Sequence, residues 1–455
     1  MKIFLNSLMA VGLFFLTMTS SSCNSEEDPI TPVGPTQNIV EIAQASGFNS
    51  LAAALVKTDL IGTLSGTTEY TVFAPTDEAF ATLLAEIGQT SIDDVPNSVL
   101  EKILLYHVVP GSVLSKDISS GSVETAAGEP IALSTASGIT VNGVAVISPF
   151  DVEATNGVIH TIGSVLVPND IAQFVNTVLE PAYFNTNFTT LIEAAVKAGV
   201  VETLLTTPNL TIFAPNNEAF ATSGIVPADL DAATLASVLT YHVVPAKVLS
   251  GEIPREAGTV NGGMIYFSLV DSGNFINGDY EITAVDIESG SGVVHVIDGV
   301  LLPASGNVVE KAIALSADGE FTSLIAALQR TADEGTAEQN LLNVLSSDGP
   351  FTVFAPTNAA FQALLDSNDS WATLSDIPLG TLVTVLTYHV VPARAFDKDI
   401  AGAVNAQNEL PTAAGVPIIL DLENLTINGN SKIIVVNQSA TNGVIHAIDT
   451  VLLPQ

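Results

Sequence analysis

Six histidines are the residues of this 455-residue chain whose spacing first suggests chemistry, because imidazole is a common metal ligand. They form three pairs, with separations of 53, 53 and 57 residues. A zinc site needs three or four ligands at characteristic spacings, and no cysteine or carboxylate stands at such a spacing here. We therefore predict no metal and no cofactor, and expect each ring to be a hydrogen-bonded core residue. The predicted core histidines are His107, His160, His242, His295, His389 and His446.

No segment of the chain matches the common catalytic motifs. The sequence has no Gly-x-Ser-x-Gly elbow, no phosphate-binding loop, no dinucleotide-binding glycine pattern and no His-Glu-x-x-His. Asp93 and Asp94 form a carboxylate pair, but they stand beside Pro96 in a predicted loop of one repeat only. A solvated entry to a helix explains that pair. We therefore predict that the protein is not an enzyme and has no catalytic residue.

A short acidic segment follows the first histidine of each pair by ten residues. An exposed carboxylate at that place could engage a metal-dependent adhesion receptor. The interpretation that we favour is that the acid caps a short helical turn while the isoleucine after it is buried. The three segments are Asp117-Ile118, Glu252-Ile253 and Asp399-Ile400, and lysine precedes the first and the third.

These residues belong to three sequence blocks that recur three times in the same order. The period is near 140 residues, which is far longer than the repeats of solenoid proteins, so we predict whole domains in tandem. The expected domains are residues 37–168, 169–303 and 304–455, joined by short linkers into a semi-rigid rod. The blocks are residues 70–80, 106–110 and 156–162, then 210–220, 241–245 and 291–297, then 351–361, 388–392 and 442–448.

Local signals predict the elements that position these blocks. A β-branched and aromatic strand ends at Pro75, and Thr76 then has the position of a helix N-cap, as Asn216 and Thr357 do in the other copies. The helix before His107 has apolar residues at spacings that place the ring on its core side. Asn-Gly pairs at 142–143 and 156–157 predict hairpins in a strand-rich second half. Each repeat is therefore α+β, with helices early and an antiparallel sheet assembly late.

The three blocks in this order resemble fasciclin domains over nearly everything after residue 37. The resemblance implies a seven-stranded β-wedge with a helical layer, used chiefly in cell adhesion and matrix contact. It also implies that the Tyr-His pair and the Lys-Asp-Ile segment are the candidate adhesion residues, although the second domain departs from the pattern with Gly251-Glu252. Those candidates are Tyr106, His107, Asp117, Ile118, Tyr241, His242, Glu252, Ile253, Tyr388, His389, Asp399 and Ile400.

The start of the chain has the features of a bacterial lipoprotein signal. A charged first dipeptide and an apolar run over residues 3–18 precede Cys23, which is the single cysteine of the chain and follows three serines that resemble a lipobox. We expect a signal peptide over 1–22, a lipid on Cys23 and an acidic, proline-rich tether over 23–36. The tether resembles the export tag of Bacteroidetes surface lipoproteins. The expected place is the outer membrane of a Gram-negative bacterium, facing outward or, alternatively, the periplasm; an ordinary secretory peptide is the other interpretation.

The charge of the chain limits the class of partner. Its net charge is -36 because only 12 Lys and Arg residues balance 48 Asp and Glu residues. Each repeat carries nearly the same share of this charge. This excludes nucleic acid and favours specific contacts with an extracellular protein or glycan. We expect a non-enzymatic adhesion or interaction protein that binds matrix, host or neighbouring-cell components. The alternatives are a glycan-binding module, for which Trp371 is the candidate contact, and a structural envelope spacer; the oligomeric state stays open.

Overall fold

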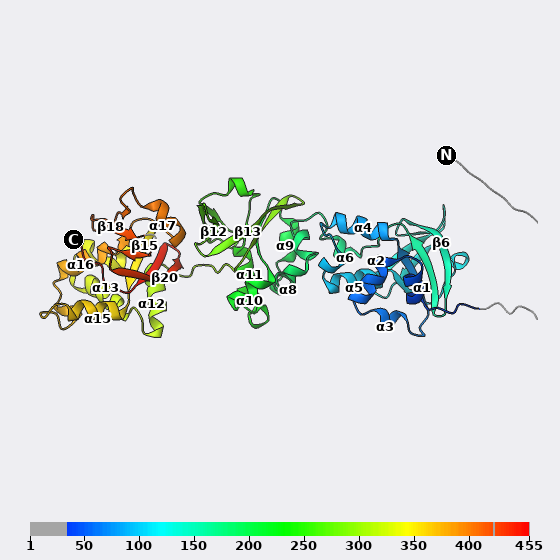
Figure 1. The fold of residues 1–455 in the computed structure, drawn as a ribbon, viewed down its shortest axis with the longest axis horizontal. Coiled ribbons are helices and arrows are strands. Elements are labelled where there is room, and N and C mark those ends of the chain that lie inside the picture. The colour runs from blue at the N-terminus through cyan, green and yellow to red at the C-terminus, as the bar shows by residue number, and fades with distance from the viewer. Residues whose placement is uncertain (1–33, 422–423, 455) are drawn as a thin grey trace, which may run out of the picture.

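The protein is a rod of three domains in line (Figure 1). The computed structural model describes residues 34–421 and 424–454, so the expected signal peptide, Cys23 and most of the tether lie outside the described residues. The first described residues and the C-terminal residues lie at opposite ends of the rod (Figure 1). No helix of the described part combines the length and the apolar character that crossing a membrane requires.

The first domain contains a seven-stranded sheet in the order β2-β1-β7-β6-β5-β4-β3. Its strands are β1 (Tyr70–Pro75), β2 (Val108–Pro110), β3 (Gly121–Glu124), β4 (Pro130–Ser134), β5 (Thr140–Val141), β6 (Val144–Ala154) and β7 (Gly157–Ile162). Its helices are α1 (Ile39–Ala45), α2 (Asn49–Lys57), α3 (Ile61–Leu64), α4 (Asp77–Glu86) and α5 (Asn97–Tyr106), with 3-10 turns η1 (Ile92–Asp94) and η2 (Ser115–Asp117).

The second domain repeats this order. Its strands are β8 (Thr211–Pro215), β9 (Val243–Val244), β10 (Glu256–Gly258), β11 (Met264–Val270), β12 (Gly273–Ile276), β13 (Tyr280–Ser289) and β14 (Gly292–Ile297). Its helices are α6 (Asn169–Ala172), α7 (Glu180–Tyr183), α8 (Thr189–Ala198), α9 (Val201–Thr206), α10 (Asn217–Ser223) and α11 (Ala232–Tyr241), with 3-10 turns η3 (Thr186–Phe188), η4 (Pro227–Asp229) and η5 (Ser250–Glu252).

The third domain adds one helix, α17, where the other two have a 3-10 turn. Its strands are β15 (Phe351–Pro356), β16 (Val390–Val391), β17 (Glu409–Leu410), β18 (Ile418–Asp421), β19 (Thr426–Ile427), β20 (Ser431–Ala440) and β21 (Gly443–Ile448). Its helices are α12 (Val308–Leu315), α13 (Thr322–Glu334), α14 (Leu341–Leu345), α15 (Asn358–Asp366), α16 (Leu379–Tyr388) and α17 (Asp397–Ala403), with 3-10 turns η6 (Ser316–Asp318), η7 (Ala337–Gln339) and η8 (Leu374–Asp376).

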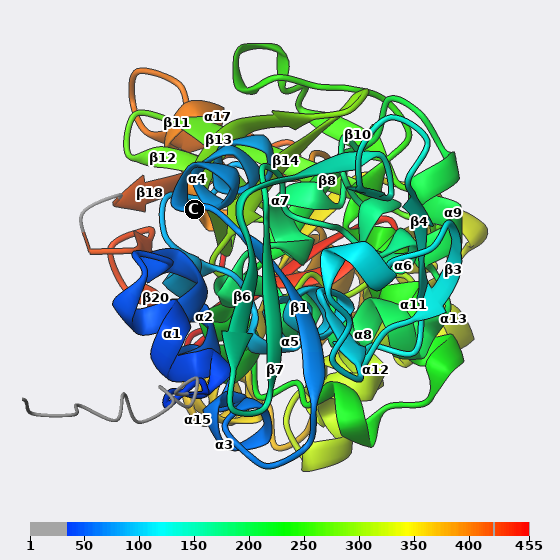
Figure 2. The same cartoon turned by 90° about the vertical axis from the view of Figure 1, so that its right-hand side faces the viewer.

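The α+β class and the seven-stranded sheet are confirmed, but the expected antiparallel assembly is wrong at its centre. β1 pairs in parallel with β7, while its other neighbour β2 is antiparallel, so the sheet is mixed. All six residues of β7 are buried, because helices cover one face and a second small core covers the other. Figure 2 looks along the rod onto the first domain, with β6, β7 and β1 in front.

The predicted caps and turns are present, with one shift of register. The side chain of Thr76 accepts a hydrogen bond from the backbone N–H of Ala79, and Asn216 and Thr357 cap α10 and α15 in the same way. In the second predicted hairpin the turn residues are Thr155 and Asn156, whereas Gly157 begins β7. A Cβ on Gly157 would lie 1.9 Å from the carbonyl oxygen of Tyr70, so only glycine allows β1 and β7 to pair here.

One basic residue in each domain fixes the 3-10 turn that precedes the histidine-bearing helix. The ammonium of Lys57 donates to the carbonyls of Ile92, Asp93 and Val95 at 2.8, 2.7 and 2.6 Å. Burial lowers the pKa of this ammonium. The matching cations are Lys197, which donates to the carbonyls of Pro227 and Ala228, and Arg330, which donates to those of Leu374 and Ile377. Lys57, Lys197 and Arg330 therefore fix the same turn in the three domains through backbone carbonyls.

We predict that Lys57→Met loosens the turn before α5. The variant keeps the apolar stem but removes the donor to three carbonyls, which costs about 1–2 kcal/mol of local stability. Hydrogen exchange of the Val95 and Leu100 amides should become roughly tenfold faster, as such a free energy implies. Lys116→Met, a change at an exposed lysine of the same domain, is the control. Equal exchange in both variants would contradict the role of Lys57.

Candidate functional site

The first histidine of each pair lies at the C-terminal end of a helix and makes only backbone contacts. His107 is 2% exposed; its Nδ1–H donates to the carbonyl of Ile103 at 2.7 Å, and its Nε2 accepts from the N–H of Leu166 at 2.8 Å. A ring that donates from one nitrogen and accepts at the other is neutral. His242 and His389 have the same two kinds of partner.

The tyrosine before each of these histidines is buried as well. Tyr106 donates its hydroxyl proton to the carbonyl of Pro130 at 3.2 Å and accepts from the amide of Asn142 at 2.9 Å. Tyr241 and Tyr388 are 2% exposed and repeat both contacts. A buried Tyr-His pair cannot contact a binding partner directly. It can shape the protein surface only by fixing the backbone segments to which it is hydrogen-bonded.

The second histidine of each pair connects the central strand to the acidic segment. The Nε2–H of His160 donates to the carbonyl of Val113 at 2.9 Å, and its Nδ1 accepts from the N–H of Asp151. The carboxylate of Asp151 in turn accepts from the N–H of Ser115 at 2.6 Å. His295 makes the same contacts in the second domain; in the third, His446 faces Asn437, which accepts from the N–H of Asp397. Sequence reasoning missed these bridges, because they join residues far apart in the chain.

The structure places the three acid-isoleucine segments in two different environments. Ile118, Ile253 and Ile400 are all buried beneath their segments. Asp117 ends η2 and Glu252 ends η5, and both side chains are exposed. Asp399 instead lies in α17, at the contact between the second and third domains. Only the first two domains therefore present this acid to solvent.

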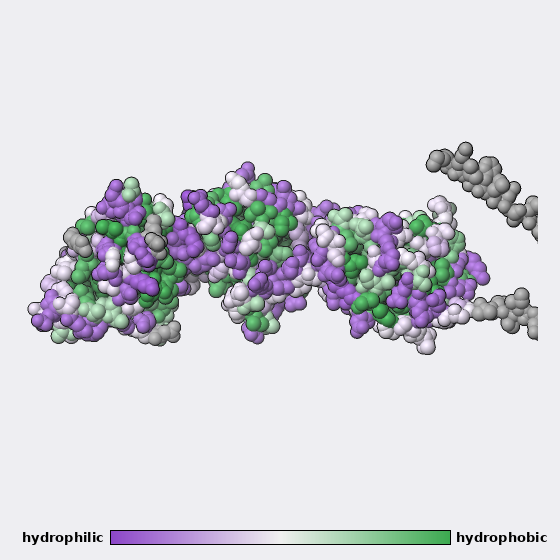
Figure 3. Space-filling view, viewed as in Figure 1, coloured by the Kyte–Doolittle hydropathy of each residue, from purple (hydrophilic) through white to green (hydrophobic). Residues whose placement is uncertain are grey.

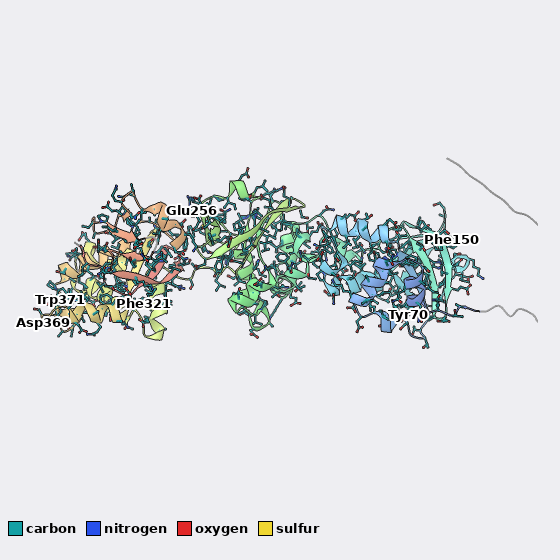
Figure 4. All side chains as sticks on the ribbon, in the orientation of Figure 1. Tyr70, Phe150, Glu256, Phe321, Asp369 and Trp371 are labelled. Atoms are coloured by element: carbon teal, nitrogen blue, oxygen red, sulfur yellow. The ribbon has the colours of Figure 1, made fainter. Side chains whose placement is uncertain are left out.

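The contact between domains 2 and 3 is built from aromatic, cationic and carboxylate groups. The guanidinium of Arg394 lies 4.0 Å from the centre of the Tyr266 ring, and the rings of Tyr266 and Phe396 are 6.1 Å apart. The hydroxyl of Ser268 donates to Asp399 at 2.9 Å. Figure 4 labels Glu256 at this contact, on the side of the second domain.

Close approach of two side chains of domain 3 to the backbone of domain 2 completes this contact. The amide of Asn437 donates to Asp279 at 2.7 Å across the domain boundary. A Cβ on Gly278 would come within 2.7 Å of Phe396, so the position needs glycine. Burial raises the pKa of Asp279 and of Asp399. The Asp399 carboxylate is therefore engaged and partly desolvated rather than free for another partner.

Domains 1 and 2 meet through a different set of residues. The ammonium of Lys102 pairs with Asp170 and lies 3.4 Å from Glu129. The apolar cores of the two domains are continuous, and within domain 2 the rings of Phe174 and Tyr183, which belong to this core, stack with their centres 3.7 Å apart. Burial raises the pKa of Tyr183 to about 12. Both joints are thus packed, as a semi-rigid rod requires.

The remaining candidates lie away from these features. Trp371 is half-buried against the core of the third domain, near the free end of the rod (Figure 4). Asp93 and Asp94 lie in η1, where Asp94 accepts from the N–H of Ser91. Within residues 34–421 and 424–454, no group of three or more His, Cys, Asp or Glu side chains is arranged to hold a metal ion.

We predict that the protein loses stability as the pH falls from about 6.5 to about 4. Burial lowers the pKa of His107, His242 and His389 to about 4, whereas an unfolded histidine titrates near pH ~6.5. The unfolded chain binds more protons between these values, so each ring removes up to about 3 kcal/mol from the free energy of unfolding. Calorimetry at about pH 7.5, 6 and 4.5, which span most of the interval between the two pKa values, measures this loss.

The variant His242→Gln tests the assignment to one ring. It should be less stable at neutral pH, because two backbone groups lose a well-placed partner, but its second-domain transition should shift less on acidification. Carboxylates whose pKa is lowered, such as Asp77 and Asp151, act in the range below about pH 4 and do not explain a loss above it. An unchanged acid shift of that transition would show that the ring is not responsible.

Comparison with known proteins gives long matches to two proteins of animals. Transforming growth factor-beta-induced protein ig-h3 of Sus scrofa is 28% identical over 433 residues, which cover 92% of this chain and 57% of that protein. Periostin of Homo sapiens is 28% identical over 417 residues, covering 90% of this chain and 46% of periostin. The chain thus spans about half the length of these curated relatives.

Further matches are to a bacterial protein, a solved structure and a family model. Protein sll1483 of Synechocystis is 42% identical over 132 residues, covering 29% of this chain and 73% of that protein. A solved domain pair from the insect cell adhesion molecule fasciclin I has 20% identity and a TM-score of 0.29, and covers 61% of this chain and 97% of its own. The Fasciclin domain matches residues 46–168, 186–303 and 319–454. The chain therefore belongs to the fasciclin domain family, with three domains in tandem.

Proposed function

We propose that the protein is a non-enzymatic adhesion or interaction protein that binds extracellular matrix, host or neighbouring-cell components. Fasciclin domains occur in cell adhesion proteins, and this chain consists of three of them over nearly its whole described length. The observation that carries the proposal is the exposure of the acidic segment in two successive domains of one packed rod, at Asp117 and at Glu252.

Repetition along the rod supports binding through weak contacts. An exposed carboxylate gives little affinity by itself, but two such groups on one rod act at high effective concentration once one of them is bound. The third copy of the segment is held at the joint with domain 2, so domains 1 and 2 carry this role. The even negative charge makes nonspecific attraction to anionic surfaces unfavourable, which leaves specific contacts, basic partners or bridging divalent cations.

The proposed place of action is the outside of the outer membrane of a Gram-negative bacterium. A lipid on Cys23 and the tether after it would hold the rod at the end of domain 1, and a periplasm-facing anchor is the alternative. Protease treatment of intact cells distinguishes the two. Cleavage of the rod without lysis supports the outward orientation, whereas protection until lysis supports the periplasm.

We predict that the double variant Asp117→Asn with Glu252→Gln reduces attachment about tenfold, since both weak contacts of the rod are lost together. The measurement is the binding of beads that carry the mature chain to surfaces coated with matrix or host-cell extract. The matched control is Asp93→Asn with Glu202→Gln, which removes two exposed acids from the same two domains.

Two results would contradict the acidic segments as the contact. An equal loss in the control pair would mean that general charge governs attachment, and no loss in either pair would mean that other residues bind. A glycan array with the intact chain tests the alternative partner. A hit that disappears in Trp371→Ala would favour a glycan-binding module, even though that ring is half-buried.

A further inference from the structure

The joint between domains 2 and 3 has two sides, and each side has a counterpart elsewhere in the chain. We call Phe396, Lys398, Asp399 and Asn437 of domain 3 the docking face. We call Tyr266, Ser268, Phe275 and Asp279 of domain 2 the acceptor face. Because the domains repeat, each face has an equivalent in the other domains.

Repeated hydrogen bonds fix the equivalence of the docking face. The N–H of Val113 donates to the hydroxyl of Thr71 in domain 1, as the N–H of Ala395 donates to Thr352 in domain 3, both at 2.9 Å. Leu114 therefore takes the place of Phe396. By the same count Lys116 and Asp117 replace Lys398 and Asp399, and Asp151, beside His160, replaces Asn437 beside His446.

The acceptor face is aligned by the buried tyrosines. Tyr241 donates to the carbonyl of Met264 in domain 2, and Tyr388 donates to that of Pro417 in domain 3. Two residues further along, Ile419 takes the place of Tyr266. The Asn-Gly turn that follows places Asn430 at the position of Asp279.

Both counterparts are open and lie at opposite ends of the rod. In domain 1, Lys116 and Asp117 are exposed, and Phe150, which precedes Asp151 in the chain, is 48% exposed at the end where the described chain begins (Figure 4). In domain 3, Ile419 is 53% exposed and Ile434 is 48% exposed on strands β18 and β20. Hydrophobic residues gather on the surface of this domain (Figure 3). At the joint between domains 2 and 3, the same kinds of face are covered by the neighbouring domain.

We propose that the docking face of domain 1 binds the acceptor face of domain 3 in a second copy of this chain. The pairing would repeat the internal joint between domains 2 and 3. Because two different faces meet, the contact is heterologous and generates an open head-to-tail filament of rods unless the rotation closes a ring.

A position-by-position comparison of the proposed contact with the joint between domains 2 and 3 supports a second copy as the partner. Leu114 and Ile419 are both apolar, as are the rings of Phe396 and Tyr266 that they replace. The pair Asn437 and Asp279 becomes Asp151 and Asn430, so amide donor and carboxylate acceptor exchange sides and the same kind of hydrogen bond can form.

Other positions make the contact weaker than the internal joint. Ser112 replaces Arg394, and Thr426 replaces Phe275, so the two cation–ring contacts have no counterpart. Asp421 replaces Ser268, the residue that donates to Asp399 in the internal joint. In the proposed contact a carboxylate would therefore face Asp117, the counterpart of Asp399. The exposed Lys432 lies two strands away from Asp421, on β20, and is the cation that can offset this repulsion. Association should therefore be reversible and dependent on concentration.

Thiol crosslinking tests the proposal in the full mature chain with Cys23→Ser, which leaves no other cysteine. The double variant Leu114→Cys with Ile419→Cys, treated with a short bismaleimide, should give a ladder of dimers, trimers and longer chains. The pair Tyr266→Cys with Phe396→Cys is the positive control, since it should crosslink within one chain and remain monomeric. Val196→Cys with Ile419→Cys is the matched negative control, because Val196 is 63% exposed but lies on α8.

Two outcomes decide the question. A ladder from the first pair that exceeds the ladder from the negative control at equal protein concentration supports the end-to-end contact. Equal ladders would overturn it, because they would report random collision. Sedimentation velocity of Ile419→Glu guards against a folding defect of the cysteine variants: the unsubstituted chain should sediment faster as its concentration rises, and the variant should not. A concentration-independent, monomeric unsubstituted chain would also overturn the proposal.

Discussion

The fold of every domain depends on two buried imidazole rings whose nitrogens bind only backbone. A buried polar group is costly unless it is hydrogen-bonded, and a buried charge is costlier still. His107 meets this constraint as a neutral ring between the carbonyl of Ile103 and the N–H of Leu166. His160 meets it between the carbonyl of Val113 and the N–H of Asp151. The first ring ties the end of a helix to the segment after the last strand, and the second ties the central strand to the acidic segment. Two of the three repeated blocks therefore contain a histidine.

Much of the domain was predictable from local signals, and the sheet pairing was not. The cap at Thr76 and the burial of His107 follow from residue type and from spacing along one helix. The parallel pairing of Tyr70 with Gly157 joins residues that 87 positions separate, and the hairpin signals around it suggest antiparallel neighbours instead. The Asn156-Gly157 pair predicts a turn at Gly157, whereas its missing Cβ makes room for the backbone of β1. The candidate acidic segments were found by their repetition, but repetition could not indicate that one of them is covered.

The joint between domains 2 and 3 forms at positions where the residues differ from those of the other repeats. Phe396 stands where the other domains have leucine, and Asp397 stands where they have Ser115 and Ser250. These changes accompany the growth of a 3-10 turn into α17 and the loss of its exposure. A comparison of the repeats identifies such positions as unusual. It does not identify Tyr266 or Asp279 as their partners, because that contact depends on the relative orientation of two domains, which no local pattern encodes.

Scarcity of cations connects the interior of the rod to its surface. Of 12 Lys and Arg, Lys57, Lys197 and Arg330 fix turns, and Lys102, Arg394 and Lys398 lie at the two joints. Few cations are left to balance 48 acidic residues at the surface, so the rod repels other anionic surfaces at short range, within a Debye length of about 8 Å. A contact that forms against this repulsion must bury apolar surface or pair its charges individually. The joint between domains 2 and 3 does both, with ring contacts at its centre and a donor beside each carboxylate. The same two requirements apply to any partner that this protein binds.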